Sequence, residues 1–122
     1  LRGLGAEVVV AARSQAARAW ASADGMEAVA IEHISEHLKN IRVLFNTVPS
    51  LIMNRSLIEC LPKTCLCMDL ASQPGIDGTA AEELGVPFLW ARGLPGKVAP
   101  ETAAAAIRDA VFHILEERGE TL

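Results

Sequence analysis

Polar residues that could bind a ligand follow several short apolar runs of the sequence. Arg13 and Ser14 follow the first run, and a guanidinium beside a serine hydroxyl supplies donors suited to a phosphate group. Asn46–Pro49 and Asp69–Gly75 follow two later runs, and Gly93–Thr102, with two Gly and two Pro, follows the last. A strand, a tight turn and a helix N-terminus in succession are typical of a ligand-facing edge in α/β proteins. The alternative for each segment is an ordinary turn or a rigid connector without a ligand.

The elements that must position these residues are short strands alternating with helices. This alternation predicts β-α-β units and a mostly parallel sheet. The carboxyl ends of parallel strands lie on one edge of the sheet, so we expect the polar segments to meet there. The predicted strands are Glu7–Ala12, Ala28–Ile31, Val43–Thr47, Cys65–Leu70 and Val86–Ala91. The predicted helices begin after Ser14, lie around Ile34–Ile41 and Leu57–Leu61, span Asp77–Leu84, and occupy the end of the chain.

The last segment predicts an irregular Gly/Pro loop followed directly by a long helix. Pro100 suits the first turn of that helix, where its missing N–H costs nothing. Ala103–Ala106 would allow the helix to lie close against a sheet. An apolar stripe at helical spacing follows, made of Ile107, Ala110, Val111, Ile114 and Leu115.

Composition and charge narrow the class of protein. The chain has 122 residues, the size of one domain, and 51% of them are hydrophobic, so it can bury a core. A net charge of −4 argues against a nucleic-acid partner. No apolar run approaches the roughly 20 residues of a membrane helix, and no signal peptide is expected. Cys60, Cys65 and Cys67 are odd in number and predict reduced thiols in a cytoplasmic protein.

Two further patterns are weaker candidates for chemistry. His33-Ile34-Ser35-Glu36-His37 matches the H-x-x-E-H pattern of some zinc peptidases. Its apolar residues are needed by the core, and the sequence offers no obvious third ligand. Cys65 and Cys67 would lie on the same side of a strand, and without a C-x-x-C spacing they indicate small core residues. We therefore expect no bound metal.

Three of the segments together resemble the A subunit of dipicolinate synthase. They are Asn46-Thr47-Val48-Pro49, Asp69-Leu70-Ala71-Ser72-Gln73-Pro74-Gly75 and Gly93-Leu94-Pro95-Gly96-Lys97-Val98-Ala99-Pro100-Glu101-Thr102-Ala103, and the similarity covers essentially the whole chain. The resemblance implies an α/β fold, a Rossmann-like three-layer αβα sandwich, in which these segments follow successive strands of a nicotinamide-binding domain. More distantly, the arrangement is similar to that of 2-hydroxyacid and alanine dehydrogenases.

The resemblance also implies a function. The family is that of a nicotinamide-dependent oxidoreductase of spore-forming bacteria, which forms dipicolinate from a dihydrodipicolinate-level precursor during sporulation. It further implies a small dicarboxylate substrate, a cytoplasmic location and a partner, the flavoprotein-like B subunit, and a homo-oligomer is a further expectation. Two alternatives stay open: a 2-hydroxyacid or alanine dehydrogenase-like domain, and a non-catalytic remnant or interaction module that keeps the sheet but binds no nucleotide.

The sequence departs from the Rossmann pattern at its beginning. A Rossmann domain opens with a strand and a Gly-rich turn that places the pyrophosphate on a helix N-terminus. Gly3-Leu4-Gly5 precedes the first strand instead of following one, so we interpret it as the end of a preceding helix. We expect residues 1–122 to form a NAD(P)-binding domain without its first strand and Gly-rich loop, and to be inactive alone. In the usual strand order, 3-2-1-4-5-6, that strand is central, which predicts a gap between the first and third strands of this chain.

The Rossmann pattern and the resemblance assign roles to the strand ends. Arg13 and Ser14 would bind the 2′-phosphate of NADP, with NAD as the alternative cofactor. Residues 47–49 would pack along the ribose and diphosphate, and the segment from Asp69 would face the nicotinamide. Lys97 could face the dicarboxylate or be solvated, and no general acid or base is identified. The predicted cofactor-binding residues are Arg13, Ser14, Thr47, Val48, Pro49, Asp69, Ala71, Ser72, Pro95, Gly96, Val98 and Pro100.

Overall fold

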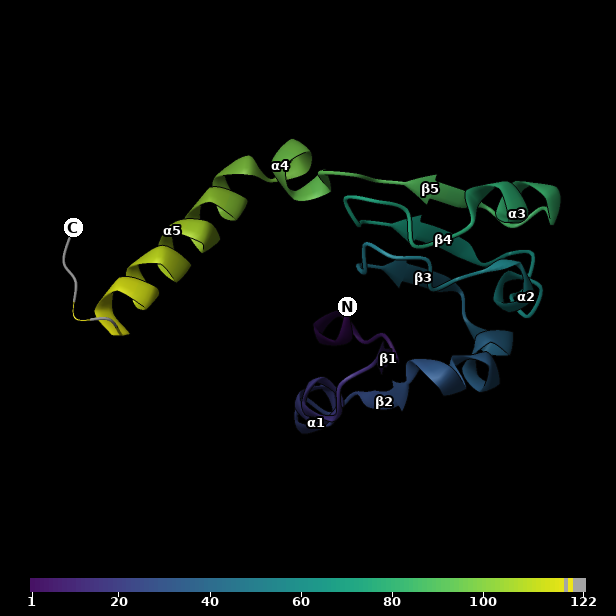
Figure 1. Cartoon of the computed structure of the whole chain (residues 1–122), viewed down its shortest axis with the longest axis horizontal. Helices are drawn as coiled ribbons and strands as arrows, with labels where there is room; N and C mark the ends of the chain where they lie inside the picture. Colours follow the sequence, from purple (N-terminus) through teal and green to yellow (C-terminus); the bar gives the residue numbers. More distant parts are fainter. Residues whose placement is uncertain (118, 120–122) are drawn as a thin grey trace.

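The computed structural model of the chain describes residues 1–117 and 119, without the side chains of Pro95 and Leu115. Strands and helices alternate, so the predicted α/β class is confirmed (Figure 1). The described strands are β1 (Val9–Ala12), β2 (Glu27–Ala30), β3 (Val43–Asn46), β4 (Leu66–Asp69) and β5 (Phe88–Trp90). The described helices are η1 (Arg2–Leu4), α1 (Gln15–Ala23), η2 (Ile31–Asn40), α2 (Arg55–Ile58), α3 (Gly78–Glu83), α4 (Leu94–Val98) and α5 (Pro100–Glu117), where η marks a 3₁₀-helix.

The strands form two parallel groups rather than one continuous sheet. β1 pairs with β2, while β3, β4 and β5 pair side by side in that order. Within the described residues, β1 and β3 therefore each have a neighbouring strand on one side only. This is the gap that the usual Rossmann strand order predicts between them, and that prediction is confirmed.

The hydrophobic core lies on one face of the three-stranded group. Leu44 of β3 and Cys67 of β4 reach into it from the sheet, and Ile58 and Ala81 cover them from α2 and α3. Leu38 of η2 joins the same cluster and is 1% exposed. Apolar residues that alternate with these along the strands lie on the other face and are 39–51% exposed, namely Val43, Phe45, Leu66 and Leu89.

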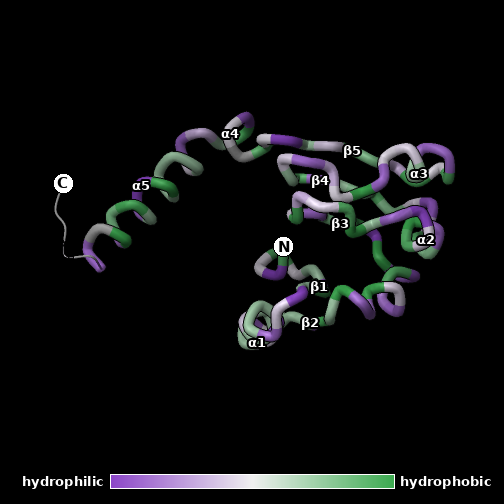
Figure 2. Tube along the Cα trace, in the orientation of Figure 1, coloured by the Kyte–Doolittle hydropathy of each residue, from purple (hydrophilic) through white to green (hydrophobic). Residues whose placement is uncertain are grey.

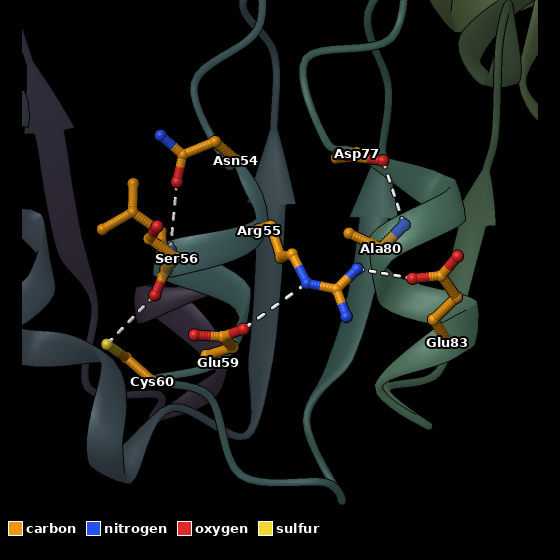
Figure 3. A network of polar contacts seen from close by, with 9 residues as sticks. Asn54, Arg55, Ser56, Glu59, Cys60, Asp77, Ala80 and Glu83 are labelled. Atoms are coloured by element: carbon orange, nitrogen blue, oxygen red, sulfur yellow. Dashed lines mark hydrogen bonds and ion pairs between the residues drawn. The ribbon is translucent and has the colours of Figure 1, made fainter.

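Caps and ion pairs fix α2 beside α3 (Figure 3). Asn54 and Asp77 cap the two helices, each accepting a hydrogen bond from the backbone N–H three residues later, at 3.1 and 3.0 Å. Arg55 of α2 donates to Glu83 of α3 at 2.5 Å and pairs with Glu59 at 3.5 Å. The hydrogen bond to Glu83 raises the pKa of Arg55, which favours the charged guanidinium in this pair.

Two local predictions require correction. The helix expected around Ile34–Ile41 is a 3₁₀-helix that begins at Ile31. The irregular loop expected after Gly93 contains the short helix α4, because Pro95 falls in its first turn, where no N–H donor is required. Gly93 precedes α4 at φ +68°, which is the conformation that the tight turn needs from this residue.

The final helix α5 begins at Pro100 as predicted, but it extends away from the sheet (Figure 1). Its closest neighbour among the described elements is α4, and the predicted packing of its alanine-rich start on the sheet is wrong for the described chain. Ile107, Val111 and Ile114 of the apolar stripe are 67, 45 and 53% exposed. Figure 2 shows apolar stretches alternating with polar ones along α5. Of the helices described, none is both long and apolar enough to cross a membrane.

Candidate functional site

The end of β1 meets the start of α1 in a turn rich in positive charge. Ser14 caps α1, and its hydroxyl accepts a hydrogen bond from the N–H of Ala17 at 3.1 Å. Arg18 reaches back from α1 and donates to the carbonyl oxygens of Ala12 and Arg13 at 2.8 and 2.7 Å. Arg13 is exposed, and the first turn of α1 contains no acidic residue. Two guanidinium groups and a helix N-terminus therefore favour an anion at this strand end.

A buried polar pair joins the ends of β3 and β4. Asn46 and Asp69 are partners in the strand register, are 6 and 0% exposed, and share a hydrogen bond of 2.9 Å from Asn46 Nδ2 to Asp69 Oδ1. The Asn46 amide also donates to the carbonyl oxygen of Val48 and accepts from its N–H, at 2.9 and 3.2 Å. These bonds fix a turn on which Thr47 and Pro49 are exposed and Val48 is half-buried.

The carboxylate of Asp69 organises the loop that follows β4. Its Oδ1 accepts from the N–H of Ala71 at 3.1 Å, and its Oδ2 accepts from Gly75 and Ile76 at 2.7 and 2.9 Å. Because Asp69 is fully buried and both oxygens are used by the chain, its side chain shapes the loop rather than meeting a ligand. Ala71 is also buried, whereas Ser72 is exposed on the loop, so Ser72 has the exposed side chain among the three residues predicted here.

Gly75 is the point where this loop passes closest to the turn after β3. A β-carbon there would collide with the side-chain amide of Asn46 and lie 2.6 and 2.7 Å from the carbonyl oxygens of Val48 and Ser50. Residues 52–53 donate to the carbonyl oxygen of Gly75 at 2.8 and 2.9 Å. The two loops are therefore packed so closely that only glycine fits.

The end of β5 adds Trp90 to the same edge. Trp90 is the register partner of Asp69, and its indole N–H donates to the carbonyl oxygen of Ala71 at 3.0 Å. The N–H of Ala91 donates to the carbonyl oxygen of Asp69 at 2.7 Å. The loop after β4 is thus held from both neighbouring strands.

The predicted residues of the last segment lie on α4 and at the start of α5. Gly96, Lys97 and Val98 are exposed on α4, and Pro100 is exposed where α5 begins. The backbone of Pro95 belongs to α4, but its side chain lies outside the described residues. A β-carbon on Gly96 would meet no other atom within 4 Å, so the folded backbone does not itself require glycine there.

The structure brings together only part of the predicted set. Thr47, Pro49 and Ser72 lie on neighbouring loops because β3 and β4 are paired. Arg13 and Ser14 follow β1, which belongs to the other strand group. The predicted site is therefore divided between the two groups.

Three residues that shape this edge were absent from the predicted set. Arg18 lies one helical turn after Ser14, and this spacing could have revealed it. Gly75 has the signal of its Pro-Gly turn, but nothing in the sequence indicates which atoms it contacts. Trp90 ends an apolar run, and nothing in the sequence indicates that its indole N–H bonds a neighbouring loop.

The two histidines of the H-x-x-E-H motif pair with nearby glutamates. His33 pairs with Glu36 at 3.2 Å, and His37 pairs with Glu27 of β2 at 3.3 Å. In a 3₁₀-helix residues four apart do not share a face, so the two imidazoles diverge. Over residues 1–117 and 119, no three His, Cys, Asp or Glu side chains are placed to hold a metal ion.

Cys65 and Cys67 are core residues, as the sequence predicts. Both are 0% exposed, and burial raises the pKa of Cys67 to about 12 and raises that of Cys65 as well. Both thiols are therefore protonated and unreactive near neutral pH. Cys60 is exposed at the end of α2.

Comparisons with known proteins agree with this fold. No family model matches the chain. The A subunit of dipicolinate synthase from Bacillus subtilis (strain 168) is 39% identical over 115 residues, which cover 93% of this chain and 39% of that protein. The crystal structure of the corresponding A subunit from Bacillus halodurans matches with a TM-score of 0.81 and 36% identity, over 93% of this chain and 40% of that one.

The crystal structure of the Bacillus subtilis protein gives the same TM-score, 0.81, at 38% identity, over 95% of this chain and 39% of that one. The chain thus spans about two fifths of the relatives that it matches. By sequence and by fold, it belongs with the A subunit of dipicolinate synthase and corresponds to a Rossmann-like portion of that protein.

Proposed function

We propose that this chain is the cofactor-binding portion of an NADP-dependent oxidoreductase of the dipicolinate synthase type. The observation that carries the proposal is the end of β1, where the exposed Arg13, the half-buried Arg18 and the N-terminus of α1 form an anion-favouring turn. In a Rossmann fold this position meets the ribose of the adenosine half, where an arginine accommodates a 2′-phosphate.

The donors present at this turn fit such a phosphate. Ser14 uses its oxygen to accept from Ala17, which leaves its O–H free to donate. The first N–H groups of α1 have no partner within the helix and point toward the same place. Arg18 holds the turn through two carbonyl oxygens, so Arg13 is presented from a fixed backbone. NAD is the alternative cofactor, and the lack of an acid at this turn speaks against it.

The loops after β3 and β4 complete the proposed site. Thr47 and Pro49 would flank the ribose and diphosphate, and Ser72 would lie toward the nicotinamide. The bound cofactor would supply hydride transfer, for which the protein provides orientation. Lys97, exposed on α4, would attract a dicarboxylate substrate. The reaction proposed is formation of dipicolinate from a dihydrodipicolinate-level precursor in the cytoplasm, in partnership with a B subunit.

The gap between β1 and β3 favours a rival proposal. A non-catalytic module could keep both strand groups and bind no nucleotide. A second dehydrogenase activity, on a 2-hydroxy or amino acid, would use the same cofactor edge. A measurement of nucleotide binding distinguishes our proposal from the non-catalytic module. A measurement of which substrate is turned over distinguishes it from the second dehydrogenase activity.

Replacing Arg13 with alanine is expected to weaken NADPH binding selectively. The test uses a chimeric protein in which this chain replaces the matching segment of the Bacillus subtilis relative. Because a hydrogen bond to a charged group is lost, the Kd for NADPH should rise by about 10- to 150-fold, while the Kd for NADH stays nearly unchanged. Fluorescence titration of both cofactors measures this.

The matched control is Arg42→Ala, since Arg42 is also exposed but precedes β3 at the opposite edge of the sheet. It should leave both affinities unchanged. Equal losses of NADPH and NADH affinity in Arg13→Ala would contradict the role in phosphate binding.

A further inference from the structure

The last residues of three neighbouring strands form a polar row across the carboxyl edge of the sheet. Asn46 is the register partner of Asp69, which is in turn the register partner of Trp90. Two positions earlier along the strands, Leu44 and Cys67 occupy the buried core. Because side chains two apart share a face, the row lies on the core side of the sheet, behind the exposed parts of the loops.

Each member of this row bonds the backbone of a loop. Asn46 holds Val48 through two hydrogen bonds, and Asp69 holds three N–H groups of the loop spanning residues 70–76. Trp90 holds Ala71 from the other side. Within the described part of the chain, every buried side-chain nitrogen or oxygen has a hydrogen-bond partner. The buried and fully satisfied pair of Asn46 and Asp69 rigidifies the loops that it holds, and Trp90, whose side chain is 42% exposed, adds its hydrogen bond at the surface.

We propose that Asn46, Asp69 and Trp90 are positioning residues for the nucleotide. They hold residues 47–49 and 71–72 in one relative placement before the cofactor arrives, so that binding costs no ordering of these loops. None of the three needs to touch the cofactor. The inference rests on the proposed function, because it names how that same site is assembled.

Asp69→Asn in the chimeric protein tests the centre of the row. The substitution keeps the shape but replaces one acceptor oxygen by an amide, which then faces N–H donors whichever way it turns. The Kd for NADPH should rise by at least about tenfold, because bonds to a charged acceptor are lost.

Trp90→Phe is the milder variant, in case Asp69→Asn does not fold. It removes one hydrogen bond to Ala71 and keeps the aromatic bulk, so the Kd for NADPH should rise by about threefold. Its matched control is Trp20→Phe, at a tryptophan that is 74% exposed on α1 and should have no effect. Amide hydrogen exchange shows whether the loop alone is loosened. In Trp90→Phe the amides of Ala71 and Gly75 should lose protection from exchange, while the amides of β4 keep theirs.

The outcomes separate the inference from the proposed function. If the unsubstituted chimera is folded and binds no NADPH, the proposed function fails. If it binds NADPH, and Trp90→Phe and Asp69→Asn bind it equally well, the positioning role is overturned. Loss of protection throughout β4 together with the loop would also overturn it, since the row would then stabilise the fold in general. Selective exposure of the loop together with weaker NADPH binding supports the inference.

Discussion

Replacing Gly75 with alanine is expected to disrupt the carboxyl edge of the sheet. The new β-carbon would collide with Asn46 and lie 2.6 and 2.7 Å from two carbonyl oxygens, so the loop must move. Movement breaks the 2.7 Å hydrogen bond from Gly75 to Asp69 and leaves part of a buried carboxylate unpaired. Overpacking and a lost charged hydrogen bond together predict a loss of about 3–5 kcal/mol, against a total stability of about 5–15 kcal/mol for ordinary domains.

Urea unfolding and thiol labelling measure this effect in the chimeric protein. Cys65 and Cys67 are buried, so they should become reactive at low urea in Gly75→Ala and stay protected in the parent. Gly96→Ala is the matched control, because its β-carbon meets open space on α4 and should leave stability unchanged or raise it by about 0.5–1 kcal/mol. A loss below about 1 kcal/mol for Gly75→Ala would show that the two loops are not packed as described.

The 122-residue chain produced on its own is expected to self-associate. Within the described residues, β1 and β3 each present one edge without a strand partner, and their side chains are mostly apolar, with no lysine to guard the edge. Exposed Val43 and Phe45 add apolar surface on β3. Unpaired backbone groups that are removed from water must find partners, and a second copy offers the same edges.

A strand supplied between the two groups should suppress this association. In the chimera, the segments of the relative that lie outside this chain can fill the gap between β1 and β3. Sedimentation at several concentrations, with thermal melts, compares the chimera with the isolated chain. The chimera should give a concentration-independent species and a cooperative melt. A monomeric isolated chain with a sharp melt would mean that the strands are complete without an inserted partner.

The sequence predicts those features that depend on local pattern. All five strands begin and end within two residues of their expected bounds, because short apolar runs between turns are a strong local signal. Ser14 caps α1 as expected, and the gap between β1 and β3 follows from the order of strands in the Rossmann pattern. Each of these features is decided by a few neighbouring residues or by a general rule of topology.

The features that the sequence does not predict depend on tertiary contacts. The bond between Asn46 and Asp69 requires the register of β3 against β4, which no local pattern contains. The alanine-rich start of α5 was expected to allow close packing on a sheet, but a run of small residues does not determine which element packs against it, and the apolar periodicity of the helix does not say what covers its apolar face. The 3₁₀ form of η2 differs from prediction because a short segment follows the packing of its surroundings.

The affinity of the chimeric protein for NADPH, measured beside its affinity for NADH, tests the proposed cofactor site most directly. A cofactor edge with Arg13 and the N-terminus of α1 at the 2′-position predicts saturable binding of NADPH at least about tenfold tighter than that of NADH. A folded chimera that binds neither cofactor, or that prefers NADH, would contradict this assignment.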